Sequence, residues 1–295
     1  MKPAPFEYSR PATLDEACAL LRADDGARLI AGGQTLVPLM AMRLARPTRL
    51  IDIARLAELA FVREEGGAIA IGAATKQCVV ESDPLIRAKL PLLAKAMPFV
   101  GHAATRARGT IGGSLANGDA AAEIVLVAVT LGAMLRFRDG GESQEVAAYD
   151  FFIGPMLTAM PPSACLVEAR FPVWSEPRVG VGLHEVNARQ SDFAFVSAAA
   201  QIAVDTEGRC VRAAVGLGAV AARPLRLDEV ARALKGTRAE PAAVRETMTV
   251  ALADVQAVSD LHASADYRRR VAVTLAMRAI ADAYQMACAR GSRAR

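Results

Sequence analysis

The sequence predicts a two-domain chain of the α+β class, and three observations support this prediction. Its 295 residues exceed the usual size of one domain. The first half alternates helices, strands and glycine turns, whereas the last third places its strands first and its helices after them. Between the two lies a proline-flanked segment, residues 172–177, which holds the single tryptophan. We therefore expect one domain over residues 1–176 and a second over residues 177–295.

Caps and glycines mark the first elements. Thr13 and Glu16 form a capping box, which starts a helix that Gly26 ends. A strand follows over residues 28–31, then a Gly-Gly turn at 32–33, a helical segment over 35–44 and a buried strand over 49–53. This order is typical of an α/β or α+β unit.

Further along, glycine turns separate hairpins and helices. The pattern predicts a hairpin over residues 59–73, proline-punctuated helices over 75–100, a second glycine loop over 109–118 and a helix over 120–131. It then predicts a hairpin over 133–147 and a strand over 164–171. In the C-terminal domain we expect strands over 182–187, 193–205 and 210–217, and helices over 227–234, 241–253 and 264–289. We interpret Tyr267 and the three arginines after it as a solvated basic face or a subunit contact.

The composition excludes several classes of protein. Hydrophobic residues make up 53% of the chain and charged residues 22%, which is typical of a globular protein. The net charge of +4 is small for this length, and aromatic residues are 5%, so nucleic-acid binding is not indicated. No apolar stretch approaches the roughly 18 residues of a membrane span, and the first ten residues lack an apolar leader segment. We therefore expect a cytoplasmic protein.

The five cysteines are scattered, without a C-x-x-C pair or a histidine at ligand spacing. The sequence thus predicts neither disulfides nor a zinc or iron–sulfur site held by this chain alone.

Two glycine-rich segments, residues 31–35 and 109–119, each lead into a predicted helix. Glycine at such a turn lets backbone amides approach an anion, and the helix start adds its own free amides. An isolated Gly-Gly is more often a tight turn without a ligand. Two such segments together favour a dinucleotide, whose two phosphates need several donors. Neither fits G-x-G-x-x-G or a P-loop, so a nicotinamide Rossmann site and an ATPase are disfavoured.

Longer motifs carry a family resemblance. Two groups of motifs resemble the FAD-binding medium subunits of the molybdenum hydroxylases. The first is the string over residues 31–40, followed by Arg43-Leu44, Pro47 and residues 50–52. The second comprises residues 100–102, Arg106 and residues 108–116. This family includes carbon monoxide dehydrogenase and the relatives of xanthine dehydrogenase. Further matching motifs stand at residues 119 and 123, 151–154, 192–194, 223–226 and 264–269, so the resemblance covers nearly the whole chain.

The resemblance implies a two-domain flavoprotein, with an FAD domain of the p-cresol methylhydroxylase type and a small C-terminal α+β domain of antiparallel sheet and helices. It places the FAD pyrophosphate on the two glycine segments, the ribityl or adenosine hydroxyls at Asp119 and Glu123, and the isoalloxazine ring near Phe193. Many family members have His-Ala-Asp-Pro where this chain has Asn117-Gly-Asp-Ala. His102 also matches the family, and as a lone histidine before a loop we interpret it as structural. The implied cofactor site comprises Ala31, Gly32, Gly33, Gln34, Thr35, Leu36, Thr110, Ile111, Gly112, Gly113, Ser114, Asn117, Asp119, Glu123 and Phe193.

The resemblance also implies the place of this chain in a larger enzyme. A large subunit would hold a molybdopterin-type molybdenum cofactor, and a small subunit would hold [2Fe-2S] clusters, in a dimer of heterotrimers. FAD in this chain would pass electrons to NAD, a quinone or oxygen. No catalytic acid or base and no metal ligand would be needed here. The substrate would bind in the large subunit, so this sequence does not name it.

Two alternatives remain open from the sequence. One is a non-catalytic assembly subunit that keeps the fold without flavin turnover. The other is a free-standing FAD oxidoreductase of the same fold with its own substrate pocket. Against the latter stand the shortage of polar catalytic candidates and the absence of a histidine or cysteine in a recognisable setting for covalent flavin attachment.

Overall fold

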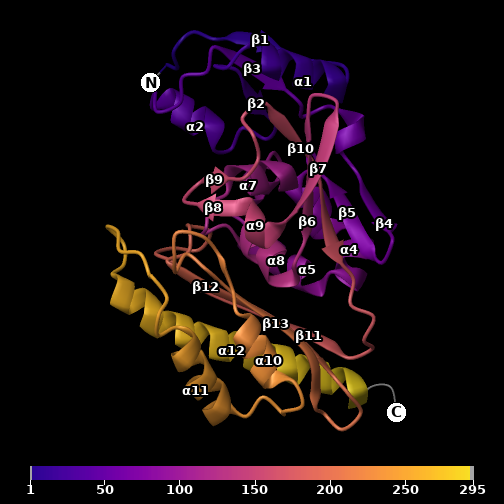
Figure 1. Ribbon diagram of the computed structural model, residues 1–295, viewed down its shortest axis with the longest axis vertical. Helices are drawn as coiled ribbons and strands as arrows, with labels where there is room; N and C mark the ends of the chain where they lie inside the picture. The colour runs from indigo at the N-terminus through magenta and orange to yellow at the C-terminus, as the bar shows by residue number, and fades with distance from the viewer. Residues whose placement is uncertain (1, 293–295) are drawn as a thin grey trace.

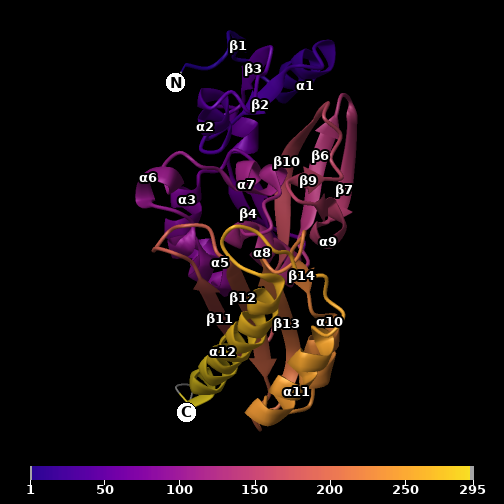
Figure 2. The same ribbon diagram turned by 90° about the vertical axis from the view of Figure 1, so that its left-hand side faces the viewer.

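The computed structural model describes residues 2–292, so Met1 and residues 293–295 of the predicted domains lie outside the described residues. The N-terminal strands and the C-terminal helix lie at opposite ends of the long axis (Figure 1 and Figure 2). Two sheets with helices packed on them form the bulk of the molecule, as expected for an α+β fold.

The N-terminal unit is a small parallel sheet in the order β1-β3-β2. Its strands are β1 (Glu7–Ser9), β2 (Arg28–Ile30) and β3 (Arg49–Asp52), with helices α1 (Leu14–Ala23) and α2 (Leu36–Ala41) beside them. Thr13 caps α1 as predicted, because its hydroxyl accepts from the Glu16 amide at 3.2 Å. The Glu16 carboxylate in turn accepts from the Ala12 amide at 2.8 Å.

The central sheet has five antiparallel strands in the order β4-β5-β10-β6-β7. They are β4 (Val62–Glu65), β5 (Ala68–Gly72), β6 (Met134–Asp139), β7 (Glu142–Ala147) and β10 (Ala164–Pro172). Four short helices follow β5: α3 (Gln77–Ser82), α4 (Pro84–Lys89), α5 (Pro91–Ala96) and α6 (Ala103–Arg106), of which α4 and α5 begin at a proline. Short 3-10 turns cover Ala57–Leu59 and Met97–Phe99.

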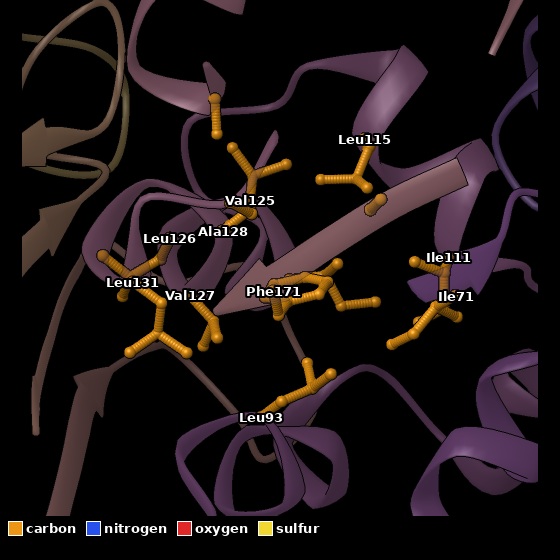
Figure 3. Packing of buried hydrophobic residues seen from close by; sticks show 14 of the residues in the cluster. Ile71, Leu93, Ile111, Leu115, Val125, Leu126, Val127, Ala128, Leu131 and Phe171 are labelled. Carbon is orange, nitrogen blue, oxygen red and sulfur yellow. The ribbon is translucent and has the colours of Figure 1, made fainter. Parts of the chain in front are cut away.

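Helix α8 (Glu123–Leu131) lies in the middle of the molecule, and all nine of its residues are buried. A helix that is apolar on every side is typical of a position inside a core. Figure 3 shows its valines and leucines together with Phe171 of β10 and Leu93 of α5. The same cluster includes Val181 and Leu183 of the second domain, so the two domains share one continuous core.

The C-terminal sheet is antiparallel in the order β11-β12-β13-β14. Its strands are β11 (Val179–Val186), β12 (Val196–Val204), β13 (Cys210–Gly218) and β14 (Leu225–Arg226). Helices α10 (Asp228–Leu234), α11 (Pro241–Ala251) and α12 (Ala265–Ser292) share a core with this sheet. Gly180 and Gly182 allow close packing of β11 on α12, because a Cβ at either would lie 2.0 Å from a helix carbonyl oxygen.

Several element boundaries differ from the sequence prediction. The prediction of a loop over residues 109–118 is wrong for most of its length, because Ile111–Asn117 forms helix α7. The strand expected from residue 193 begins only at Val196. Helix α9 (Ala148–Phe151) and the hairpin of β8 (Phe152–Gly154) and β9 (Leu157–Thr158) were not predicted, nor were β1 and β14. None of the helices described over residues 2–292 is long and apolar enough to cross a bilayer.

Candidate cofactor-binding site

A cleft of about 560 Å³ lies where the N-terminal unit, helix α7, the β8–β9 hairpin and the loop before β12 meet. This size falls within the usual range of cofactor sites, roughly 300–1,000 Å³. The lining comes from three stretches of the first domain (residues 28–36, 109–119 and 156–166), from Leu21, Leu39, Ile53, Ala73 and Ala122, and from Phe193 of the second domain. The cleft thus brings together both glycine segments and Phe193.

The first glycine segment is a tight turn between β2 and α2. Gly33 has φ of +68°, a conformation that a side chain disfavours. At Gly32 a Cβ would lie 2.4 Å from the Arg108 carbonyl oxygen and 2.7 Å from the Gly109 Cα, so the two glycine segments touch here. The Leu36 amide, the first of α2, has no acceptor among the described residues and lies at the cleft, whereas the Val37 amide donates to the Gly33 carbonyl oxygen at 3.0 Å. This turn can therefore bind an anion.

In the second glycine segment, the first amides of α7 are hydrogen-bonded within the protein. Thr110 caps α7, and its hydroxyl accepts from the Gly113 amide at 3.0 Å. The Ile111 and Gly112 amides donate to the carbonyl oxygens of Thr75 and Ala73 at 3.0 and 2.9 Å. Since these amides have protein acceptors, this segment offers a ligand the Ser114 hydroxyl, the helix dipole and close approach at the exposed Gly113.

Glycine at position 112 is required by packing. A Cβ there would lie 2.4 Å from the Ala73 Cβ, at the point where α7 crosses the end of β5. Ile111 is fully buried in the core and does not line the cleft. These two residues anchor α7, and Gly112 lies at the cleft together with Gly113, Ser114, Ala116 and Asn117.

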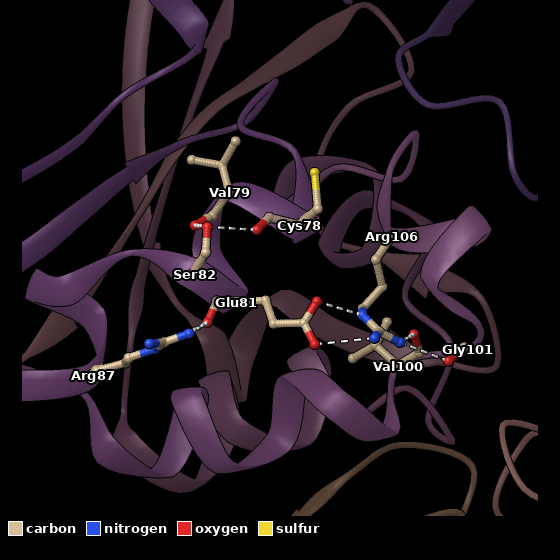
Figure 4. A network of polar contacts seen from close by, with 8 residues as sticks. All are labelled: Cys78, Val79, Glu81, Ser82, Arg87, Val100, Gly101 and Arg106. Carbon is tan, nitrogen blue, oxygen red and sulfur yellow. Dashed lines mark hydrogen bonds and ion pairs between the residues drawn. The ribbon is translucent and has the colours of Figure 1, made fainter.

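The loop that leads into Thr110 is held by one arginine, as Figure 4 shows. The Arg106 guanidinium makes two bonds to the Glu81 carboxylate, at 2.8 and 3.0 Å. It also donates to the carbonyl oxygens of Val100 and Gly101. His102 is exposed, begins α6 and lies outside the cleft lining.

The polar residues after α7 divide into two groups. Asn117 and Asp119 line the cleft, and Gly118 between them ends α7 with φ of +65°. Glu123, in contrast, is 7% exposed and lies outside the lining. Burial, with the nearby charges of Glu185 and Asp119, raises the pKa of Glu123 to about 8, so its carboxyl group is largely protonated at neutral pH.

Large apolar side chains stand exposed at the cleft. Met156 and Leu157 of the β8–β9 hairpin are 59% and 56% exposed, and Phe193 is 67% exposed. Met156 also has φ of +51°, which is rare for a residue other than glycine and is often found at functional sites. Exposed apolar groups around a concave site are typical of a surface that a ring system covers. No sequence pattern predicted a role for the hairpin residues, although the motif at 151–154 stands beside them.

Comparison with known proteins decides the family. The pattern described as FAD binding domain in molybdopterin dehydrogenase matches residues 4–174, and that of the CO dehydrogenase flavoprotein C-terminal domain matches residues 183–283. The chain is 34% identical over 283 residues to the carbon monoxide dehydrogenase medium chain of Afipia carboxidovorans, covering 95% of this chain and 97% of that one. This chain belongs to the FAD-binding medium subunits of the molybdenum hydroxylases.

Other members of this family are equally similar. The nicotine 6-hydroxylase medium subunit of Paenarthrobacter nicotinovorans is 33% identical over 284 residues, covering 96% of this chain and 99% of that one. The crystal structure of quinoline 2-oxidoreductase from Pseudomonas putida 86 matches with a TM-score of 0.92 and 34% identity, over 98% of this chain and 100% of that one. These comparisons confirm the predicted family and the two-domain α+β fold.

The residues of this medium subunit fit FAD. The Gly32-Gly33 turn provides an anion site, and a Cβ at Gly32 would push the two glycine segments apart. The apolar hairpin and Phe193 provide surfaces for a flat ring. The subunit is thus the FAD-binding medium subunit of a molybdenum-dependent oxidoreductase.

Proposed function

We propose that this subunit positions FAD to accept electrons from [2Fe-2S] clusters of a partner subunit and to pass them to an external acceptor. FAD supplies the exchange between one-electron and two-electron transfer. The chain itself binds the pyrophosphate at residues 31–36, supports it at residues 110–114, and contacts the hydroxyl groups through Asn117 and Asp119. Ile111 and Glu123 support these residues from the buried side.

One observation carries this proposal. Among the described residues that line the cleft, the only titratable side chains are Arg28 and Asp119. No histidine, cysteine, lysine or tyrosine lines it, so Asp119 is the one side chain in this lining that could act as a general base, and the usual side chains for covalent flavin attachment are absent from it. This favours an electron-transfer flavoprotein over a free-standing oxidoreductase.

The chain also lacks a cluster site within residues 2–292. No group of three or more histidine, cysteine or acidic side chains could hold a metal ion there. Burial raises the pKa of Cys165 to about 12 and that of Cys210 to about 11, so these thiols stay protonated. The clusters of the relay therefore belong in a partner.

We further propose that the domains meet at residues 176 and 177, that the subunit works in a cytoplasmic dimer of heterotrimers, and that NAD, a quinone or oxygen is the acceptor. Purification of the chain from its native host tests the assembly. Size exclusion should show co-elution with a cluster subunit and a larger molybdenum subunit, and metal analysis should find iron and molybdenum. A chain that elutes alone and oxidises a substrate at full rate would support the free-standing oxidoreductase instead.

The state of the flavin gives a second test. Denaturation should release a yellow compound that chromatographs as FAD, because no side chain in the cleft can form the usual covalent link. A colourless assembly that takes up no FAD would favour the non-catalytic assembly subunit. Flavin that remains on the denatured chain would contradict the non-covalent site.

A further inference from the structure

Arg268 lies in the first turn of α12, within the arginine run that the sequence suggested as a solvated face. That expectation is wrong for this residue, because Arg268 is 3% exposed. A buried guanidinium is costly unless its donors are used. Its partners therefore show what the residue holds in place.

Those partners are three separate segments of the second domain. The Arg268 guanidinium donates to the carbonyl oxygen of Phe195 at 2.5 Å and to that of Ala219 at 2.6 Å. It also donates to the Asp260 carboxylate at 2.5 Å. Asp260 is itself fixed, because its other carboxylate oxygen accepts from the amides of His262 and Ala263 at 2.9 and 3.0 Å.

Two of these segments, those of Phe195 and Ala219, are linked to residues that line the cleft or adjoin its lining. Phe195 ends the loop that carries Phe193 into the cleft, and its ring stacks on His262 with centroids 5.4 Å apart. Ala219 has φ of +59°, a strained conformation for alanine that only firm surroundings maintain. Its amide donates at 2.8 Å to the carbonyl oxygen of Ala120, which directly follows Asp119 in the cleft wall.

We propose that Arg268 is a positioning residue for FAD binding. It holds the loop that carries Phe193 at a fixed distance from the first-domain side of the cleft, where Asp119 lies. A single planar guanidinium bonds the carbonyl oxygens of Phe195 and Ala219, so it fixes the distance between these two segments, and the Ala219 amide extends the link to Ala120 beside Asp119. Lysine carries the same charge but lacks the rigid fork and cannot bond all three partners in this geometry. This proposal rests on the proposed placement of FAD in the cleft.

The test compares four variants in the native assembly, after removal of flavin and titration with FAD. Phe193→Ala should raise the Kd for FAD about tenfold, the effect of losing one aromatic contact. Arg268→Lys should raise it by a similar factor, about three- to tenfold. Arg270→Lys is the matched control, since Arg270 is exposed on the same turn and contacts the Tyr267 ring. It should leave the Kd unchanged.

The double variant separates positioning from general stability. If Arg268 acts through Phe193, then Arg268→Lys should change the Kd less than twofold once Phe193 is already alanine. A full additional loss in that background would overturn the proposal, as would an unchanged Kd in Arg268→Lys alone. Where Arg268→Lys fails to assemble, Asp260→Asn takes its place, since it weakens the anchor of the guanidinium without removing it.

Hydrogen exchange of the flavin-free assembly gives a readout that does not depend on FAD. Amides of residues 187–195 should exchange faster in Arg268→Lys than in the wild type or in Arg270→Lys. Equal exchange in all three would overturn the positioning role. If the wild type takes up no FAD while the exchange difference is present, then the placement of FAD fails and the structural link stands.

Discussion

Gly32→Ala tests the contact between the two glycine segments. A Cβ at Gly32 would lie 2.4 Å from the Arg108 carbonyl oxygen, whereas ordinary contact begins at 3.4 Å. The segments must therefore separate by about 1 Å, and both neighbours are backbone atoms that cannot rotate away. Overpacking of this kind costs roughly 1–3 kcal/mol. We expect the Kd for FAD to rise about 5- to 150-fold if the strain is relieved by opening the site.

The assay is FAD titration of the flavin-free assembly, followed by flavin fluorescence, together with thermal unfolding. Gly141→Ala is the control, because nothing lies within 4 Å of its Cβ and the residue does not line the cleft. It should change neither the Kd nor the Tm. The reasoning is refuted if Gly32→Ala binds FAD as tightly as the wild type, or if Gly141→Ala weakens binding to the same extent.

Three further perturbations follow from the structure. Leu157→Ala should raise the Kd for FAD several-fold in an FAD titration, because Leu157 lines the cleft. Ile153→Ala should leave the Kd unchanged, because Ile153 is exposed on the same hairpin but lies outside the cleft lining. Equal effects of the two changes would contradict an apolar contact between Leu157 and FAD. Arg106→Met should lower the free energy of unfolding in urea by about 1–3 kcal/mol, because Glu81 loses its two bonds; an unchanged midpoint would show that the pair contributes nothing. Because the pKa of Glu123 is raised from 4.5 to about 8, its carboxyl group between these pH values is protonated in the folded state and ionised in the unfolded state. The free energy of unfolding should therefore fall as pH rises through that window. Glu123→Gln should flatten this slope in Tm measurements, and an unchanged slope would assign it to other groups.

The sequence predicted those parts of the fold that depend on local chemistry. The Thr13 cap, the prolines at the starts of α4 and α5, and the glycine turns of the hairpins each define an element through contacts a few residues apart. The family motifs led to the correct fold class and cofactor, and the structure brings both glycine segments to one cleft.

The remaining features depend on contacts between distant residues. Helix α7 looks like a loop in sequence because two of its seven residues are adjacent glycines, yet the Gly112 amide donates to the Ala73 carbonyl oxygen and fixes its first turn. Phe193 continues an apolar run into β12, so periodicity could not separate it from the strand. Arg268 reads as surface because two of its partners lie 49 and 73 residues away. No local pattern contains these contacts.

Electron flow through the native assembly tests the central claim most directly. The assembly is mixed anaerobically with its substrate, and the absorbance of clusters and flavin is followed before FAD removal, after it, and after FAD is restored. The account predicts that substrate reduces the clusters in all three preparations, while reduction of the external acceptor is lost without FAD and returns with it. Acceptor reduction at full rate in the flavin-free assembly would contradict the account.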